Sequence, residues 1–265
     1  MTVLNEAILA FLAAHVTADF LLQTRRDIEN KGRISVLAKH GAIHAVLVFI
    51  FAGTWTAWFP ALIISSTHVI VDLGKTRVKA KGWRAFLVDQ ALHGVVILLA
   101  AWLTVRFDFL DDSLWKELFG VIYFHMIAVV AGFIVTVTAG AYFVEQAVEP
   151  FLGQIRRDAS RRESGRVPEP AHVGDGDRAV HAPSRGLKHG GRTIGQLERA
   201  LIFVFVLIDQ YAAIGFLVAA KSIFRFGELR ERSNRMEAEY IIIGTLISFL
   251  WALVAASLTR LIAGF

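Results

Sequence analysis

The sequence predicts an all-α, polytopic helical membrane protein, and three observations predict it. Hydrophobic residues make up 55% of the 265 residues, and the mean hydropathy is +0.53. Apolar runs close to the ~18 residues that read as a membrane span recur along the chain. Pairs of His and Asp four residues apart sit in or beside the first four runs, where ionisable groups usually mark a site. We expect about seven spans, at 4–22, 36–57, 59–74, 86–105, 118–145, 198–220 and 239–262.

Three of these spans need separate justification. The first could be mistaken for a signal peptide, but it lacks a basic start and carries Glu6, so we expect a retained helix. The third is short and follows Pro60. The sixth is broken by Asp209-Gln210; we expect one full span, and the alternative is a re-entrant hairpin of two half-helices, 198–208 and 211–220. An amphipathic interfacial helix is expected at 222–236.

The charges of the connections predict the orientation. Connections 23–39 and 75–85 are basic, 53–60 has no Lys or Arg, and 107–117 is acidic. Because basic loops stay in the cytoplasm, the N-terminus is predicted outside. The net charge of +5 is then explained by topology and attraction to anionic membrane lipids, and nucleic acid is not an expected partner.

Composition divides the chain into three parts. Residues 1–149 form an N-terminal membrane bundle, whose first four helices carry the His/Asp pairs. Residues 150–192 are polar and rich in Arg, Gly, Asp, Pro and Ser, which predicts a flexible cytoplasmic linker. Residues 193–265 form a C-terminal membrane hairpin with the interfacial segment.

The four His/Asp pairs predict one buried metal site. Residues four apart lie on one face of a helix. In the predicted topology all pairs fall in the cytoplasmic half of the bundle and form two layers. The deep layer holds His15, His44, His68 and His93, and the layer nearer the cytoplasm holds Asp19, His40, Asp72 and Asp89.

The chain has no cysteine, so nitrogen and oxygen atoms must hold any metal. Imidazole with carboxylate suits Zn, Mn, Fe or Ni. Two ions could share the eight ligands, or one ion could take four of them while the others orient the histidines. Both arrangements stay open, as does the plainer interpretation that the pairs are interhelical hydrogen bonds. Asp19, Asp72 and Asp89 are the candidate catalytic carboxylates.

Polar neighbours suggest further sites. Gln23, Lys75 and Arg77 are candidates for binding an anionic substrate, although the two cations could equally be topology determinants. His125 is expected to be a packing histidine, and His172, His181 and His189 to be solvated. In the C-terminal unit a second site, which could dock a protein partner, would comprise Glu198, Asp209, Lys221, Arg225 and Glu239.

Several of these motifs resemble a known family. The stretch from His15-x3-Asp19 to Gln23, the pair His68-x3-Asp72 and the pair Asp89/His93 resemble bacterial membrane proteins of the domain of unknown function 3307 family. The C-terminal stretches 194–199, 213–226 and 239–249 add to the resemblance. It implies a polytopic protein of the bacterial inner membrane and no particular activity. The His/Asp pattern is more loosely similar to membrane-bound metal-dependent hydrolases.

Three functions compete. The first is a metal-dependent hydrolase that acts on a lipid-like or phosphorylated substrate at the cytoplasmic leaflet. The second is a transporter of divalent metal or protons, which would need a polar path through the outer half as well. The third is a membrane scaffold whose His/Asp site binds a metal ion only to stabilise the fold. The substrate, the metal and the oligomeric state are not predicted.

Overall fold

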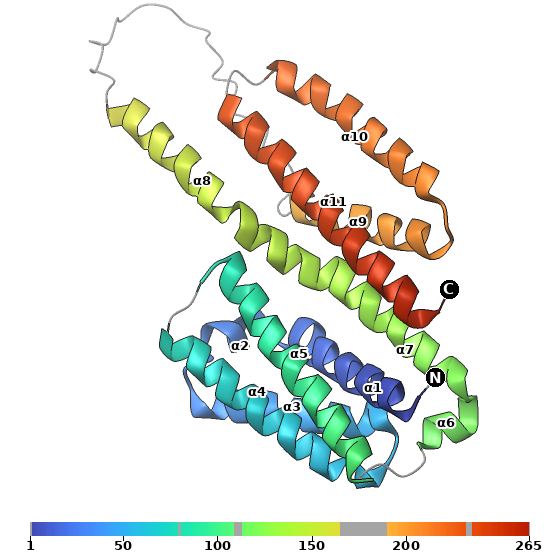
Figure 1. Ribbon diagram of the computed structural model, residues 1–265. Coiled ribbons are helices and arrows are strands. Elements are labelled where there is room, and N and C mark those ends of the chain that lie inside the picture. The colour runs from blue at the N-terminus through green and yellow to red at the C-terminus, as the bar shows by residue number, and fades with distance from the viewer. Residues whose placement is uncertain (1, 79–80, 109–112, 165–189, 232–234, 265) are drawn as a thin grey trace, which may run out of the picture.

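The computed structural model describes residues 2–78, 81–108, 113–164, 190–231 and 235–264. Every regular element in these ranges is a helix (Figure 1). Six helical segments are long and apolar enough to cross a membrane, which confirms an all-α membrane protein. They are Val3–Leu22, Ile34–Ala52, Trp55–Val78, Trp83–Arg106, Val121–Asp158 and Ala238–Ala263.

The elements follow the predicted order with different bounds. The N-terminal part contains α1 (Val3–Thr17), the π-helix η1 (Ala18–Leu22), α2 (Arg25–Glu29), α3 (Ile34–Ala52), the short 3-10 helix η2 (Trp55–Ala57), α4 (Trp58–Val78) and α5 (Trp83–Arg106). Then follow α6 (Leu114–Phe119), α7 (Val121–Phe133), the π-helix η3 (Ile134–Ala139) and α8 (Gly140–Ser164). The C-terminal part contains α9 (Gly190–Leu207), α10 (Tyr211–Glu231) and α11 (Arg235–Ala263).

Helices α1, α3, α4 and α5 form the predicted four-helix bundle. They make a ring, because α1 packs on α3, α3 on α4, α4 on α5 and α5 on α1. Helix α1 also packs on α7, so it lies between the other three helices of the ring and the rest of the molecule (Figure 1). Its buried residues include Ala7, Ala10, Ala13 and Ala14, whose small side chains let neighbouring helices approach closely.

Helices α3, α4 and α5 each bury one stripe with helical period, whereas α1 is buried over most of its surface. On α4 the stripe is Ala61, Ile64, His68 and Asp72, apolar first and polar last. On α5 the order is reversed, with Asp89 and His93 first and Ile97, Ala100 and Thr104 after them. Since the two helices are antiparallel neighbours, the polar ends meet. The opposite faces expose large apolar side chains, as expected for contact with lipid.

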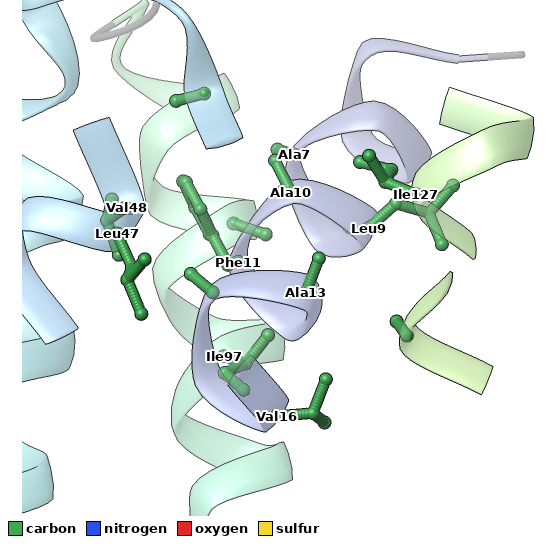
Figure 2. Packing of buried hydrophobic residues seen from close by; sticks show 14 of the residues in the cluster. Ala7, Leu9, Ala10, Phe11, Ala13, Val16, Leu47, Val48, Ile97 and Ile127 are labelled. Atoms are coloured by element: carbon green, nitrogen blue, oxygen red, sulfur yellow. The ribbon is translucent and has the colours of Figure 1, made fainter. Parts of the chain in front are cut away.

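An apolar layer fills the other end of the ring. Phe11 of α1, which is fully buried, packs among Leu47 and Val48 of α3 and Ile97 of α5 (Figure 2). Beyond this layer, near the start of α1, the buried Glu6 accepts from Lys116 at 2.9 Å. The layer therefore separates that ion pair from the polar end of the bundle.

The second predicted span, 36–57, is too long at its C-terminal end. Helix α3 ends at Ala52, because Gly53 adopts a left-handed conformation with φ of 67° and caps the helix. Donors from the α6–α7 region satisfy its last carbonyls: Trp115 Nε1 donates to Ile50 O at 2.6 Å and Tyr123 Oη to Phe51 O at 2.8 Å.

The fifth span differs from its prediction at both ends and in its middle. Residues before Gly120 form the separate helix α6, and the π-helix η3 interrupts the span. A π-helix leaves carbonyls badly placed for the helix's own N–H groups. Two side chains from the C-terminal part satisfy them: Trp251 Nε1 donates to Val135 O at 3.1 Å, and Arg199 donates to Val137 O.

The predicted continuous helix 198–220 is wrong, because the chain breaks at Asp209-Gln210; that the two halves form a re-entrant hairpin stays a prediction. Helix α9 ends in a Schellman-type turn, in which Gln210 N donates to Phe205 O and Asp209 N to Val206 O. Asp209 has φ of 62°, a left-handed conformation that Asp tolerates better than most residues. The apolar helix that follows, Tyr211–Ile223, is shorter than the length needed to cross a membrane.

Two other expectations change at their boundaries. Helix α8 continues to Ser164 and α9 begins at Gly190, so the ends of the predicted 150–192 linker are helical. Its central residues 165–189, with His172, His181 and His189, lie outside the described residues. The interfacial helix expected at 222–236 is, up to Glu231, the continuation of α10.

Candidate metal centre

The structure brings all eight predicted His and Asp side chains into one cluster. They come from α1 with η1, α3, α4 and α5, and seven of them are buried while Asp19 is nearly so. The cluster contains three groups. Within each group, one ligand atom of every residue lies within 4.8 Å of the ligand atoms of the other members. The groups are His15, Asp19, His44 and His68; His40, His68 and Asp72; and Asp72, Asp89 and His93.

Asp19 lies among the histidines rather than in the predicted carboxylate layer. Its Oδ1 is 3.1 Å from Nε2 of both His40 and His44, and 3.4 Å from Nε2 of His68. Its Oδ2 is 3.9 Å from His15 Nε2. Asp19 belongs to the π-helix η1, an irregular turn of a kind often found at functional sites. The irregular turn thus supplies the central carboxylate.

His68 connects the histidines to each other. Its Nε2 is 3.0 Å from His40 Nε2, and its ring stacks on that of His93 with centroids 4.1 Å apart. It also contacts the rings of His44 and His15, at 3.8 and 5.5 Å. The four histidines predicted to form one layer do pack together in this way.

The other two carboxylates are bound by lysines. Lys31 Nζ donates to both oxygens of Asp72 at 2.9 Å, and Lys75 Nζ donates to Asp89 Oδ2 at 2.7 Å. Gln90 lies next to them, with its Oε1 3.3 Å from His15 Nε2. One side of the cluster therefore carries two ammonium groups, and the group around Asp19 carries none.

Three buried ligand atoms have no hydrogen-bond partner within the described part of the chain: His44 Nδ1, Asp89 Oδ1 and His93 Nε2. The last two are 3.8 Å apart, too far for a hydrogen bond. Leaving such atoms unsatisfied is costly. Nitrogen and oxygen atoms about 2.0–2.1 Å from one ion lie about 3.0–3.4 Å from each other. Four separations around Asp19 and His68 fall in this range, and the 3.9 Å between His15 Nε2 and Asp19 Oδ2 lies outside it, so the residues fit a divalent ion with His15 as the more distant ligand.

A cavity of about 460 Å³ reaches the cluster at Asp19 and Asp89. Lysines and amides form one part of its wall, and aromatic residues form another. The polar part includes Gln23, Lys31, Lys75, Lys81, Gln90 and Gln146, and the apolar part includes Phe20, Ile28, Phe86 and the ring of Tyr142.

Helix α2 forms part of this wall despite having only five residues. Thr24 and Asp27 make a capping box that satisfies its first N–H groups. Lys39 Nζ donates to Asp27 Oδ1 at 2.8 Å, and this bond, with those from Thr24, lowers the pKa of the Asp27 carboxyl. The carboxylate is therefore charged across the neutral range and holds α2 against the start of α3.

The structure separates the other predicted residues. Gln23 and Lys75 line the cavity, whereas Arg77 is exposed and does not. His125 lies in α7, outside the cluster. The proposed second site divides: Glu198 pairs with Lys221, and Asp209 pairs with Arg260 at the α9–α10 turn. Glu239 is exposed near the start of α11, and the side chain of Arg225 lies outside the described residues.

Sequence reasoning missed three partners. The bond between Lys31 and Asp72 spans 41 residues, so no local spacing indicates it. The contact between His15 and Gln90 spans 75 residues. Arg199, buried in the C-terminal part, was not selected, although an arginine directly beside Glu198 in an apolar stretch was a usable signal.

An all-helical membrane protein with a buried cluster of five histidines and three aspartates is the class that fold and site define. Residues 7–119 match the family described as "Protein of unknown function (DUF3307)", so this segment is similar to that family. The match contains all eight cluster residues. The C-terminal stretches 194–199, 213–226 and 239–249, which also resemble the family, lie outside the matched residues. No curated protein and no solved structure gives a significant match.

Proposed function

We propose that the His/Asp cluster holds one or two divalent metal ions and that the protein is a metal-dependent membrane hydrolase. Its substrate would be lipid-like or phosphorylated and would enter from the cytoplasmic side. The observation that carries the proposal is the convergence of eight ligand side chains from four helices, with the buried Asp89 Oδ1 and His93 Nε2 unsatisfied among the described residues. When bound, a divalent ion supplies Lewis-acid chemistry suited to hydrolysis.

The group of His15, Asp19, His44 and His68 is the better first site for an ion. It offers four ligands, and among the described residues no lysine contacts its only carboxylate. The separate group of Asp72, Asp89 and His93 would hold a second ion only in competition with Lys31 and Lys75. We therefore expect one tightly held ion and a weaker second position.

The cavity supports an amphiphilic substrate with an anionic group. Lys75 and Lys81 can bind phosphate oxygens, and Phe20 and Phe86 can cover an apolar portion. In this position Asp89 and Gln90 lie between the substrate and the histidines, where a carboxylate can accept a proton from water. The cavity opens beside α2, which belongs to the connection predicted to be cytoplasmic.

The apolar layer in the bundle favours a hydrolase over a transporter. Phe11 and Val48 have no exposed surface, and Ile97 is 3% exposed. They lie between the His/Asp cluster and the Glu6–Lys116 pair at the other end of α1. Within the described residues this leaves the polar cluster open toward one side only, whereas transport needs access from both.

The test measures metal content and phosphate release together. Purified protein would be stripped with a chelator, reloaded with Zn, Mn, Fe or Ni, and analysed by inductively coupled plasma mass spectrometry. Hydrolysis would be followed with p-nitrophenyl phosphate and with micellar phosphatidic acid. We expect stoichiometric metal and metal-dependent phosphate release from the wild type, with both lost in His68→Ala.

His125→Ala is the matched control, since it removes a membrane histidine outside the cluster. It should keep the metal and the activity. A wild type that binds no metal after reloading would refute the metal site. Metal without hydrolysis of either probe would leave the site standing and would refute the proposed phosphoester chemistry.

A further inference from the structure

A second cavity, of about 470 Å³, lies in the C-terminal part between α8, α9, α10 and α11. Arg199 of α9 lies in its wall and is only 2% exposed. Its neighbour Glu198 is also buried and pairs with Lys221 of α10. The hydrolase proposal uses none of these residues.

The buried charge of Arg199 is bound only by neutral groups. Its Nε and Nη2 donate to Val137 O at 3.3 and 3.1 Å, and its Nη1 donates to Ser248 Oγ at 2.9 Å. No carboxylate in the described part of the chain lies within ion-pair distance of it, because Glu198 is directed to Lys221. Glu198 acts on the charge of Arg199 only through space, and a buried charge without a directly bonded counter-charge is unfavourable. A guanidinium also has more N–H donors than these bonds use.

The whole lining has an excess of positive charge. Among its described residues are four cationic and two acidic side chains, an excess of two. They are Arg25, Arg192, Arg199 and Lys221, with Glu145 and Glu198. Gly195 has no side chain, which leaves space beside Arg199 Nη1, since an added Cβ would lie 3.4 Å from that atom.

We propose that this cavity is a binding site for a phosphate group, carried by the headgroup of an anionic phospholipid. The phosphate would supply the counter-charge of Arg199 and bind Lys221 and Arg192, the groups that suit phosphate oxygens. The lipid source is favoured because Ile194 and Leu197, on the same helix, are 56% and 61% exposed. Acyl chains can lie against these residues.

The site is connected to the His/Asp cluster through a third cavity of about 790 Å³. This middle cavity shares Arg25 and Arg192 with the phosphate site, and Ile28 and Tyr142 with the cavity at Asp19. The three together form a trough past α2 and α8. The phosphate site itself is independent of the proposed hydrolysis and is tested without it.

The experiment measures lipid retention. Purified full-length protein would be equilibrated in mixed micelles of phosphatidylglycerol and phosphatidylcholine, and bound lipids counted by native mass spectrometry. We expect selective retention of phosphatidylglycerol by the wild type. Lys221→Gln should weaken it about tenfold, as for the loss of one charge-assisted hydrogen bond. Glu198→Gln should strengthen it several-fold, because the excess of positive charge in the lining rises from two to three.

Lys116→Gln is the matched control, since it removes a lysine from a Lys–Glu pair at the other end of the molecule. It should leave retention unchanged.

A second arm adds inorganic phosphate to the protein in phosphatidylcholine micelles and measures the melting temperature. A phosphate-dependent rise that is lost in Lys221→Gln, without selective lipid retention, would identify free phosphate as the source. No selectivity in either arm, or equal retention by Lys221→Gln, Glu198→Gln and wild type, would overturn the proposal. Size-exclusion chromatography confirms that both variants are folded.

Discussion

At the residue scale, the cluster is asymmetric in charge. Asp19 contacts three histidine Nε2 atoms within 3.4 Å, while Asp72 and Asp89 are neutralised by Lys31 and Lys75. The eight candidate ligands therefore do not form equivalent metal positions, although their side chains are of similar types. The lysines supply the counter-charges of two buried carboxylates, and they also weaken the second ion position.

Replacing one of these lysines should change the metal stoichiometry. In Lys75→Gln the buried Asp89 loses its counter-charge, so a cation becomes the favourable partner. We expect the number of bound ions per chain, measured by mass spectrometry after reloading, to rise from one toward two. Lys116→Gln removes an equivalent pair far from the cluster and should not change it. A lower metal content in Lys75→Gln would contradict this account.

At the scale of single elements, the chain uses irregular helix turns at its important positions. The π-helix η1 carries Asp19, and the π-helix η3 presents carbonyls to Arg199 and Trp251. Close helix contacts accompany these turns. At Gly132 an added Cβ would lie 2.1 Å from Thr259 Oγ1 and 2.7 Å from its Cβ, so α7 and α11 touch almost without intervening side chains.

This contact predicts different outcomes for two glycine substitutions. Gly132→Ala should destabilise the protein by about 1–3 kcal/mol, because the stiff Thr259 side chain cannot move away without shifting α11. Gly94→Ala, on α5, meets nothing within 4 Å and should be neutral or slightly stabilising. Melting temperatures in detergent would measure both, and equal melting temperatures would show that α7 and α11 are farther apart than described.

At the scale of the whole molecule, the break at Asp209 separates two possible topologies of the C-terminal part. Helix α9 and the apolar half of α10 meet at this turn, and Glu198 pairs with Lys221 away from it. Residues 198 and 221 therefore lie at the same level. This supports the re-entrant alternative, in which both ends of the hairpin face the cytoplasm and the basic charge after Lys221 agrees with the positive-inside rule.

Single cysteines can test this topology, because the natural chain has none. In spheroplasts a membrane-impermeant maleimide should label Glu117→Cys, on α6, and should not label Gly32→Cys or Gly191→Cys until the membrane is permeabilised. All three positions are exposed. Ser222→Cys, past Lys221 on α10, should behave like Gly191→Cys. Labelling of Ser222→Cys from outside would instead show that the hairpin crosses the membrane.

The sequence alone predicted the helical membrane class, the four-helix bundle and the eight cluster residues. It could do so because apolar run length and i, i+4 spacing are local properties, and antiparallel packing turns them into one polar level. It predicted one continuous sixth span, because the left-handed turn at Asp209 changes hydropathy very little.

Only the tertiary structure decided which groups meet. The Lys31–Asp72 bond, the His15–Gln90 contact and the bonds of Arg199 to Val137 O and Ser248 join residues 41 to 75 positions apart. Their energies depend on burial and on the partners left available, which no local pattern encodes. The asymmetric placement of lysines around the cluster, which sets the order of the metal positions, and the charges that meet in the C-terminal cavity follow from these long-range contacts.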